Sequence, residues 1–246
     1  MQVALLADIH GNMDALEAVL NDADSKGIRT LAVCGDLVGY YYRIGDVLSA
    51  LKERDAVMCR GNHEDMLQNY IDGDEETRSA IQKKYGSSYA SACEELSDEE
   101  MNILLGLEHP VSIDFDGVRF LLSHGCPWGI DTYLYPDASE EDLKNLQNYQ
   151  NDCDVIVTAH THYQAAWQYE GLTVINPGSV GQPRSGKTRE DNFIARAHWA
   201  SYDTERKTFE HHETTYDCTN LFKEIESRDP DLPFLKNVLK RQEYLT

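Results

Sequence analysis

The sequence lacks the features of membrane-spanning and disulfide-rich proteins. It has no long apolar run, and residues 2–7 lead directly into a polar segment, so we expect neither a membrane span nor a signal peptide. The six cysteines show no Cys-x-x-Cys spacing and several lie in apolar runs, which predicts reduced thiols in the core. These absences predict a cytoplasmic protein with no membrane partner.

Basic residues are also scarce. The chain of 246 residues has 22 Lys and Arg against 43 Asp and Glu, which gives a formal net charge of −21 at pH 7. Proteins that bind nucleic-acid polymers use Lys and Arg to neutralise phosphates, so no such partner is expected. Binding of small anionic ligands remains possible, because it needs only a local positive site. An acidic composition of this kind commonly serves solubility or adaptation to salt. The sequence does not determine the oligomeric state.

Five strand-like apolar runs each end in polar residues that can bind metal ions. The runs span residues 3–7, 31–34, 56–59, 118–122 and 155–158. The segments that follow them are Asp8-Ile9-His10, Gly35-Asp36, Gly61-Asn62-His63-Glu64, Ser123-His124-Gly125 and Ala159-His160-Thr161-His162. In open α/β sheets, binding sites gather at the carboxyl ends of strands. We therefore expect these segments to meet in one site.

The donor types in these segments favour transition metals. Carboxylate, imidazole and one amide oxygen, without thiolate, suit divalent Mn, Fe, Co, Ni or Zn better than Ca or Mg. The donors are too many for one ion, whereas two ions about 3.5 to 4 Å apart and bridged by one carboxylate would use them. Such a pair can hold a hydroxide and bind a phosphoryl oxygen, which predicts a hydrolase of phosphate esters.

The order of the five segments resembles the calcineurin-like metallophosphoesterase superfamily. Residues 176–184, Asn-Pro-Gly-Ser-Val-Gly-Gln-Pro-Arg, are similar to the tail of its compact bacterial and archaeal phosphodiesterase branch. Each segment alone is a weak signal, but all five in this order rarely arise by chance, and together they cover about three-quarters of the chain.

The resemblance implies a role for each candidate residue. One metal ion would be held by Asp8, His10, Asp36 and His162, and the other by Asp36, Asn62, His124 and His160. A hydroxide bridging the ions would attack phosphorus in line, while His63 protonates the leaving-group oxygen and Arg184 contacts the phosphate. Mn is the first candidate for the two ions, with Fe, Zn, Ni and Co as alternatives.

Ordinary structural explanations stay open for single residues. Taken alone, His160 and His162 could be loop histidines, and Asn62 could cap a helix that begins at His63. Ala159 replaces a glycine of the family pattern, which is tolerated if its φ is negative.

Gly39 and Tyr40 differ from the residues found at these positions in one branch of the superfamily, and this difference bears on the reaction. In the Ser/Thr protein phosphatase branch an Asp-Arg pair stands here, and its Asp orients the catalytic imidazole. The replacement argues against a phosphoprotein phosphatase and leaves open which group orients His63.

The order of elements predicts one domain over residues 1–246, an α/β four-layer sandwich of two mixed β-sheets flanked by helices. Helices are expected at 12–26, 44–54 and 63–70, with hairpins at 166–175, turning at Glu170-Gly171, and at 193–215, turning near Asp203-Thr204. Residues 72–108, with a capping box at Ser97 to Glu100, predict a helical insertion near the active site, and 219–246 predict closing helices.

The predicted substrates are small phosphodiesters, nucleotides or dinucleoside polyphosphates. A phosphomonoesterase or protein phosphatase, a metal-dependent nuclease and a non-catalytic protein-binding scaffold are the alternatives. The aromatic residues Tyr40, Tyr41, Tyr42, Trp128, Tyr133 and Tyr135 could stack on a nucleobase, although ordinary packing is the favoured explanation. Arg60 is a second candidate for a phosphate contact, or a member of a surface ion pair.

Overall fold

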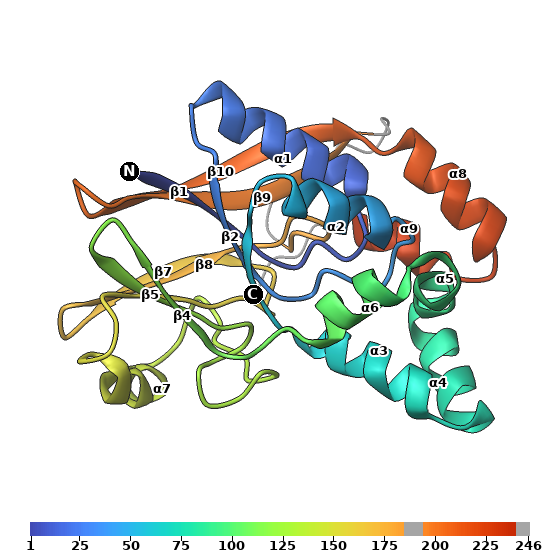
Figure 1. Cartoon of the computed structure of the whole chain (residues 1–246), viewed down its shortest axis with the longest axis horizontal. Coiled ribbons are helices and arrows are strands. Elements are labelled where there is room, and N and C mark those ends of the chain that lie inside the picture. Colours follow the sequence, from blue (N-terminus) through green and yellow to red (C-terminus); the bar gives the residue numbers. More distant parts are fainter. Residues whose placement is uncertain (185–193, 240–246) are drawn as a thin grey trace.

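Two five-stranded sheets stack face to face in the computed structural model, which describes residues 1–184 and 194–239 (Figure 1). The first sheet has the spatial order β10 (Thr208–Asp217), β9 (Ile194–Asp203), β1 (Gln2–Leu6), β2 (Thr30–Cys34) and β3 (Val57–Cys59). Strands β1, β2 and β3 run parallel, whereas β9 is antiparallel to both β1 and β10. The sheet is therefore mixed, as predicted.

The second sheet repeats this mixture of directions. Its order is β4 (Val111–Phe115), β5 (Val118–Leu122), β6 (Val155–Val157), β8 (Leu172–Pro177) and β7 (Gln164–Tyr169). Strands β5, β6 and β8 are parallel, and β4 and β7 are antiparallel edge strands. The β7–β8 hairpin turns at Glu170 and Gly171, as predicted, whereas β9 and β10 turn over residues 204–207, slightly later than predicted. Residue 193, the predicted start of that hairpin, lies outside the described residues.

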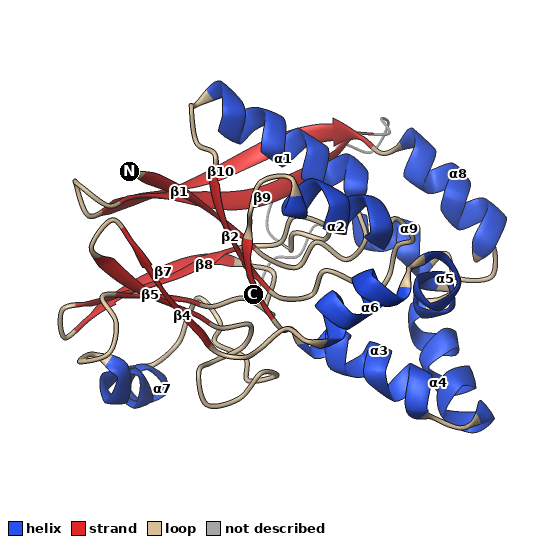
Figure 2. Ribbon diagram, in the orientation of Figure 1, coloured by secondary structure: helices blue, strands red, loops and turns tan. Residues whose placement is uncertain are grey.

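Helices cover the outer faces of both sheets and one end of the sandwich (Figure 2). They are α1 (Met13–Ser25), α2 (Ile44–Lys52), α3 (Asn62–Asp72), α4 (Glu75–Tyr85), α5 (Ser88–Glu95), α6 (Asp98–Leu105), α7 (Glu140–Lys144), the 3-10 helix η1 (Asn145–Tyr149), α8 (Thr219–Arg228) and α9 (Phe234–Leu239). The four-layer prediction is confirmed. In the part of the chain that the structure describes, no helix is long and apolar enough to cross a bilayer.

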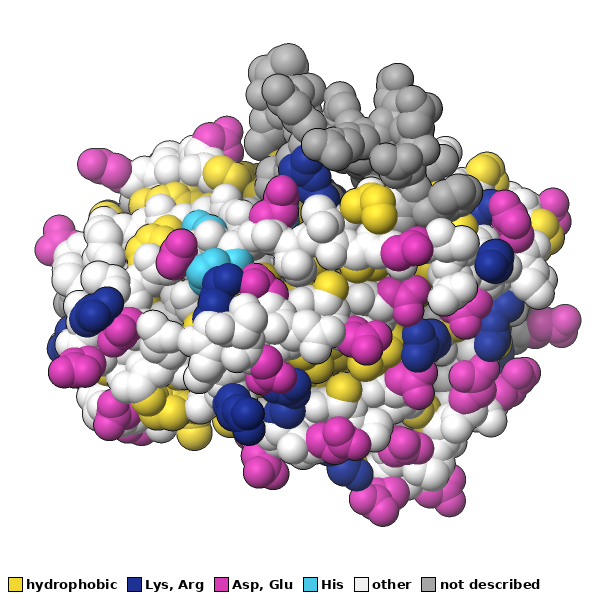
Figure 3. All heavy atoms as spheres, turned by 90° about the horizontal axis from the view of Figure 1, so that it is seen from above, with side chains coloured by type: hydrophobic (Ala, Val, Ile, Leu, Met, Phe, Trp, Pro, Cys, Tyr) yellow, Lys and Arg dark blue, Asp and Glu magenta, His cyan; other side chains and the backbone are white. Residues whose placement is uncertain are grey.

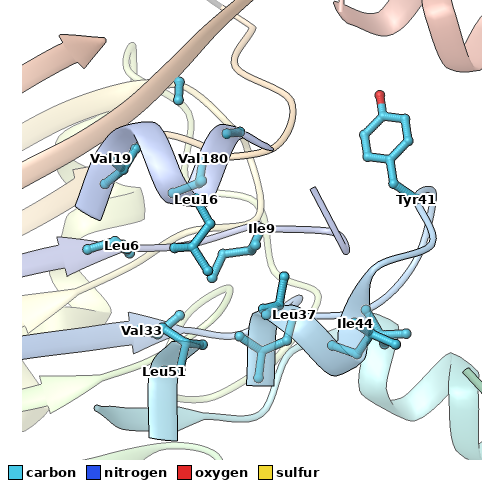
Figure 4. Close-up of a cluster of buried hydrophobic side chains, with 14 of the residues drawn as sticks. Leu6, Ile9, Leu16, Val19, Val33, Leu37, Tyr41, Ile44, Leu51 and Val180 are labelled. Carbon is cyan, nitrogen blue, oxygen red and sulfur yellow. The ribbon is translucent and has the colours of Figure 1, made fainter. Parts of the chain in front are cut away.

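The core between the sheets is apolar on both inner faces. It contains Leu5 of the first sheet and Phe120 of the second, both almost fully buried. A second cluster joins the outer face of the first sheet to α1, whose Leu16 and Val19 point toward Leu6 (Figure 4). Each such side chain contributes about 1.5 to 3 kcal/mol by burial. The first sheet is therefore packed on both faces, which holds the ends of its strands in place.

The predicted helical insertion consists of α4, α5 and α6. Its capping box is confirmed, because the Ser97 hydroxyl accepts a hydrogen bond from the Glu100 N–H at 3.3 Å and the Glu100 carboxylate accepts one from the Ser97 N–H at 2.9 Å. The predicted closing helices correspond to α8 and α9, and residues 240–246 lie outside the described part. Five of the six cysteines are buried, but Cys93 on α5 is exposed, so the prediction of a core position is wrong for that residue.

The surface reflects the acidic composition. Seen from above, Asp and Glu side chains are spread over the visible face and are interleaved with fewer Lys and Arg (Figure 3). The charge is thus dispersed on this face rather than gathered in a basic groove.

Candidate active site

The predicted segments meet where the carboxyl ends of the parallel strands of both sheets face the helical insertion (Figure 1). This edge carries residues from five loops, each directly after a strand. They are Asp8 and His10 after β1, Asp36 after β2, Asn62 and His63 at the start of α3, His124 after β5, and His160 and His162 after β6. All the predicted metal-ligand positions are therefore brought to one place.

The backbone at this edge is strained. Five of the candidate ligands adopt a positive φ, with values of 52° to 69°. They are Asp8, His10, Asp36, His160 and His162. Non-glycine residues rarely adopt this conformation, and it is concentrated at functional sites, where surrounding contacts hold it. Ala159 is not among them, so the condition under which an alanine is tolerated at this position is met.

The candidate ligand atoms point toward one another. The Nε2 atom of His162 lies 3.4 Å from Asp8 Oδ1 and 3.3 Å from His10 Nε2. On the other side, His124 Nε2 lies 3.0 Å from Asn62 Oδ1 and 3.1 Å from His160 Nδ1. The structure thus contains two neighbouring donor groups.

Asp36 lies between the two groups. Its Oδ2 atom is 3.9 Å from His10 Nε2 on one side and 3.2 Å from His124 Nε2 on the other. Its Oδ1 atom accepts a hydrogen bond from the backbone N–H of His63 at 2.8 Å, which fixes the carboxylate. This is the position expected of a bridging ligand.

Backbone carbonyl groups orient three of the imidazoles. The Nδ1 atoms of His10, His124 and His162 lie 3.2, 2.9 and 2.8 Å from the carbonyl oxygens of Val38, Cys34 and Gln182. Nδ1 must donate in each of these hydrogen bonds, so each neutral ring turns its Nε2 lone pair toward the cluster. Where such lone pairs converge, a proton or a metal ion is needed between them.

The burial of the cluster also indicates that a cation is needed. Both carboxylate oxygens of Asp8 and the Nε2 atom of His160 are buried without a hydrogen-bond partner. Unpaired buried polar atoms are costly, and a metal ion would satisfy them. In the described residues, three groups of carboxylate and imidazole atoms each lie within 4.8 Å of one another, and one of these groups includes His63. The mixed N and O donors suit transition metals. The residues therefore fit a dinuclear metal site.

The pKa values follow from burial and from the two carboxylates. Burial lowers the pKa of His10 to about 3 and raises that of Asp8 to about 8. Burial also opposes a charge on His124, but Asp36 and Asp8 overcome it and raise the pKa of His124 to about 10. Without metal, a proton on His124 balances part of the negative charge.

Glu64 supports the cluster from beneath, a role that the sequence did not reveal. Its fully buried carboxylate accepts hydrogen bonds from the backbone N–H groups of Asp36, Leu37, Val38 and Gly61 at 2.7 to 3.2 Å. It thereby ties the loop after β2 to the start of α3. The helix begins at Asn62 with Gly61 as its N-cap, so the suggested capping role of Asn62 is wrong.

His63 lies beside the cluster, in an aromatic environment. Its Nε2 atom is 4.0 Å from Asp36 Oδ2, and its Nδ1 atom is 2.6 Å from the hydroxyl of Tyr89 on α5. Tyr40 stacks on the imidazole with ring centroids 5.0 Å apart. Burial raises the pKa of Tyr89 well above its usual range, so this side chain keeps its hydroxyl proton. Sequence analysis did not identify Tyr89, because it lies in the insertion outside every family motif.

A cavity of about 550 Å³ opens above the cluster. Its floor includes Asp36 and His63, and its walls carry two cationic side chains, the predicted Arg184 and Lys84 of α4. Lys84 was also missed, since a lysine in the last turn of a helix that has a second lysine beside it gives no specific signal in the sequence. The volume is that of a small-molecule site.

Other predicted contacts lie outside this cavity. Arg60 forms an ion pair with Asp65 and donates a hydrogen bond to the Leu105 carbonyl. Its role is therefore the ion pair that the sequence offered as the alternative to a phosphate contact. Tyr41 and Tyr42 are buried and donate their hydroxyl protons to the Leu235 carbonyl and to Asp229. These contacts support packing as the role of the two tyrosines.

The remaining aromatic residues differ in their position. Trp128 is exposed and stacks on Tyr149, away from the cavity lining. Tyr133 is half exposed, lines the cavity and contacts the ring of His160 at 4.2 Å. Tyr133, and not Trp128, is therefore the ring that lines the cavity.

Comparison with known proteins agrees with this geometry. The model of the calcineurin-like phosphoesterase superfamily domain matches residues 1–197, a range that includes every candidate site residue. The chain belongs to this superfamily. As a member it is a phosphoesterase, and the predicted hydrolase activity on phosphate esters is confirmed at that level.

The similarity to known proteins extends over nearly the whole length of this phosphoesterase. An uncharacterised protein of Methanocaldococcus jannaschii is 26% identical over 240 residues, which cover 91% of each chain. The crystal structure of a hypothetical protein from Pyrococcus horikoshii OT3 has a TM-score of 0.79 at 20% identity, and that of a metallophosphoesterase from Sphaerobacter thermophilus has 0.73 at 23% identity. Each comparison covers 98% of both chains. At these identities the structural likeness shows the fold.

Proposed function

We propose that this phosphoesterase hydrolyses small phosphodiesters, nucleotides or dinucleoside polyphosphates with two divalent transition-metal ions, Mn being the first candidate. The observation that carries the proposal is the cavity of about 550 Å³ whose floor is the cluster of carboxylates and imidazoles. A space of this size accommodates a nucleotide-sized ester.

Each metal ion would be held by donors from both sheets. One set is Asp8, His10, Asp36 and His162, and the other is Asp36, Asn62, His124 and His160. When bound, the two ions would lower the pKa of a water molecule and neutralise charge on the phosphoryl oxygens. The placement of Asp36 Oδ2 between the two sets supports its role as the bridge.

His63 is proposed to protonate the leaving group. Its Nε2 atom faces the cluster and Nδ1 faces α5, so a proton on Nε2 can reach an ester oxygen bound at the cavity floor. As the bond between phosphorus and the leaving oxygen breaks, this oxygen takes the Nε2 proton and His63 becomes neutral. General acids of this kind contribute about 10² to 10⁴ in rate.

The walls of the cavity favour a compact anionic substrate. Arg184 and Lys84 can neutralise phosphate oxygens, and Arg184 can bind two of them at once. The ring of Tyr133 gives an apolar surface for a nucleobase. Helix α4 contributes Lys84 and Tyr85 to the wall, so a phosphorylated side chain of a folded protein would have to pass the insertion.

A panel of substrates tests this proposal. Purified enzyme with Mn²⁺ would be assayed against bis-p-nitrophenyl phosphate, p-nitrophenyl phosphate, dinucleoside polyphosphates, cyclic nucleotides and a phosphopeptide. We expect diesters or nucleotide anhydrides to give the highest kcat/KM. Higher kcat/KM on the monoester or the phosphopeptide would replace the proposal by the monoesterase alternative. No hydrolysis with any of Mn, Fe, Zn, Ni or Co would favour the scaffold.

A further inference from the structure

We propose that Tyr89, in the helical insertion, is the positioning residue that orients the imidazole of His63 for proton transfer. This inference rests on the proposed general-acid role of His63 and adds the group that the sequence left open. Tyr89 is not among the residues that line the cavity. It acts through His63, on the side of the ring that faces away from the metal-capable cluster.

The contact is short and enclosed. The Tyr89 hydroxyl lies 2.6 Å from His63 Nδ1, and both side chains are buried. The two rings stack at 6.1 Å with an interplanar angle of 18°, while Tyr40 stacks at 5.0 Å and Tyr85 makes an edge contact at 5.0 Å. The rings restrict tilting of the imidazole, but stacking alone does not determine which nitrogen faces the site. The hydrogen bond to Nδ1 does so.

Gly39 explains why the partner of His63 comes from the insertion. In the phosphatase pattern this place belongs to the Asp that orients the imidazole. Here a Cβ atom at residue 39 would lie 2.1 Å from His63 Nδ1, and the φ of +95° disfavours any side chain. The imidazole therefore occupies the space that such a side chain would need, and the free side of Nδ1 faces α5.

The Tyr89 hydroxyl can hold Nδ1 before and after the proton transfer. It accepts a hydrogen bond from Nδ1–H in the imidazolium, and Nδ1 keeps its hydrogen in the neutral ring that remains after the Nε2 proton has moved to the leaving oxygen. The same contact therefore persists in both states. The orientation of His63 is kept through the cycle.

The start of α5 is fixed from a distant part of the chain. The Asp229 carboxylate accepts hydrogen bonds from the Ser87 N–H and Ser87 hydroxyl, both at 2.9 Å, and from the Tyr42 hydroxyl at 2.8 Å. Ser87 lies two residues before Tyr89. The segment that carries Tyr89 is therefore tied to the residue after α8, which supports a defined position for its hydroxyl.

The test compares Tyr89→Phe with Tyr70→Phe. Tyr70 stacks on Tyr89 at 6.1 Å and lies outside the cavity lining, so this control removes a hydroxyl from the same aromatic cluster. With an alkyl diester, Tyr89→Phe should lower kcat by about tenfold to hundredfold, a part of the general-acid contribution, and leave KM unchanged. With a p-nitrophenyl ester the loss should be small, because that leaving group needs little protonation. Tyr70→Phe should match the wild type on both substrates.

A double mutant separates positioning from a general structural effect. In the His63→Ala background, Tyr89→Phe should cause no further loss, since its effect passes through the imidazole. A proton NMR signal shifted far downfield by the short hydrogen bond should be present in the wild type and Tyr70→Phe, and absent in Tyr89→Phe and His63→Ala.

The possible failures can be distinguished. An unchanged kcat of Tyr89→Phe on the alkyl diester, alongside a loss in His63→Ala, would overturn the role of Tyr89 and leave the proposed function intact. An equal loss on both esters, or a further loss in the His63→Ala background, would also overturn it. If His63→Ala itself keeps full activity on the alkyl diester, the general-acid proposal fails and the role of Tyr89 fails with it.

Discussion

The strand ends and the helical insertion contribute to the same site in different ways. The strand ends supply donor atoms from short local motifs, and each candidate ligand follows its strand by a few residues. The insertion supplies Lys84, Tyr85 and Tyr89, which reach the site only because α4 and α5 fold over it. The candidate metal ligands can thus be found from local sequence, whereas the environment of His63, the proposed proton donor, depends on tertiary structure. Substitutions in the two regions should fail in different ways.

Substitution at the bridge should have the largest effect. Asp36→Asn removes the carboxylate that lies between the two donor groups, so the protein should lose both ions and at least about 10³-fold in activity. Elemental analysis and turnover would be measured together. Asp46→Asn, at an exposed position on α2, is the control and should keep both ions. An Asp36→Asn protein that still carries two ions per chain would refute the bridge assignment.

Substitution of His63, the proposed proton donor, should separate chemistry from metal binding. His63→Ala should keep both ions and lower turnover by about 10² to 10⁴ on esters with poor leaving groups. The loss should be smaller with p-nitrophenyl esters. Equal losses on the two kinds of ester would argue against proton donation by His63.

Much of the first region could be predicted from the sequence, and little of the second. Asp8, Asp36 and His124 each stand directly after an apolar run, so strand direction alone brings them to one edge. No local pattern places Tyr89 against His63, because 26 residues, which include the whole of α4, separate them.

Exposure is the other property that the sequence did not reveal. Tyr41 and Tyr42 are buried, and Cys93 is exposed on α5. Neither result follows from residue type, since tyrosines serve equally in cores and in binding sites. Glu64 was noticed only as part of a motif, whereas its four backbone hydrogen bonds depend on the meeting of two loops.

Metal affinity should depend on pH, because two candidate ligands at the strand ends carry protons that a metal ion must displace. In the metal-free protein the pKa of His124 is raised to about 10 and that of Asp8 to about 8, so both hold a proton at pH 7 that metal must displace. Affinity should therefore rise with pH, about tenfold per unit between pH 8 and 10 and more steeply below pH 8. Calorimetric titration in buffers of different ionisation enthalpy would count the released protons. Binding without proton release would contradict this assignment.

Substrate selection should show the smallest effect. Tyr133→Ala removes the ring that lines the cavity, and stacking on a base contributes about 1 to 3 kcal/mol, so kcat/KM for a nucleotide substrate should fall by roughly tenfold or more. A methyl diester should be unaffected. Trp128→Ala, which removes an exposed ring outside the cavity lining, is the matched control. Loss with both substrates, or with neither, would remove the nucleobase from the proposed substrate.

Anomalous scattering from crystals grown with Mn²⁺ tests the dinuclear site most directly. Two peaks about 3.5 to 4 Å apart are expected within the cluster, both next to the Asp36 carboxylate. One peak should lie beside Asp8 and His10, and the other beside Asn62 and His124. A single peak, or two peaks that do not share Asp36, would contradict the dinuclear site.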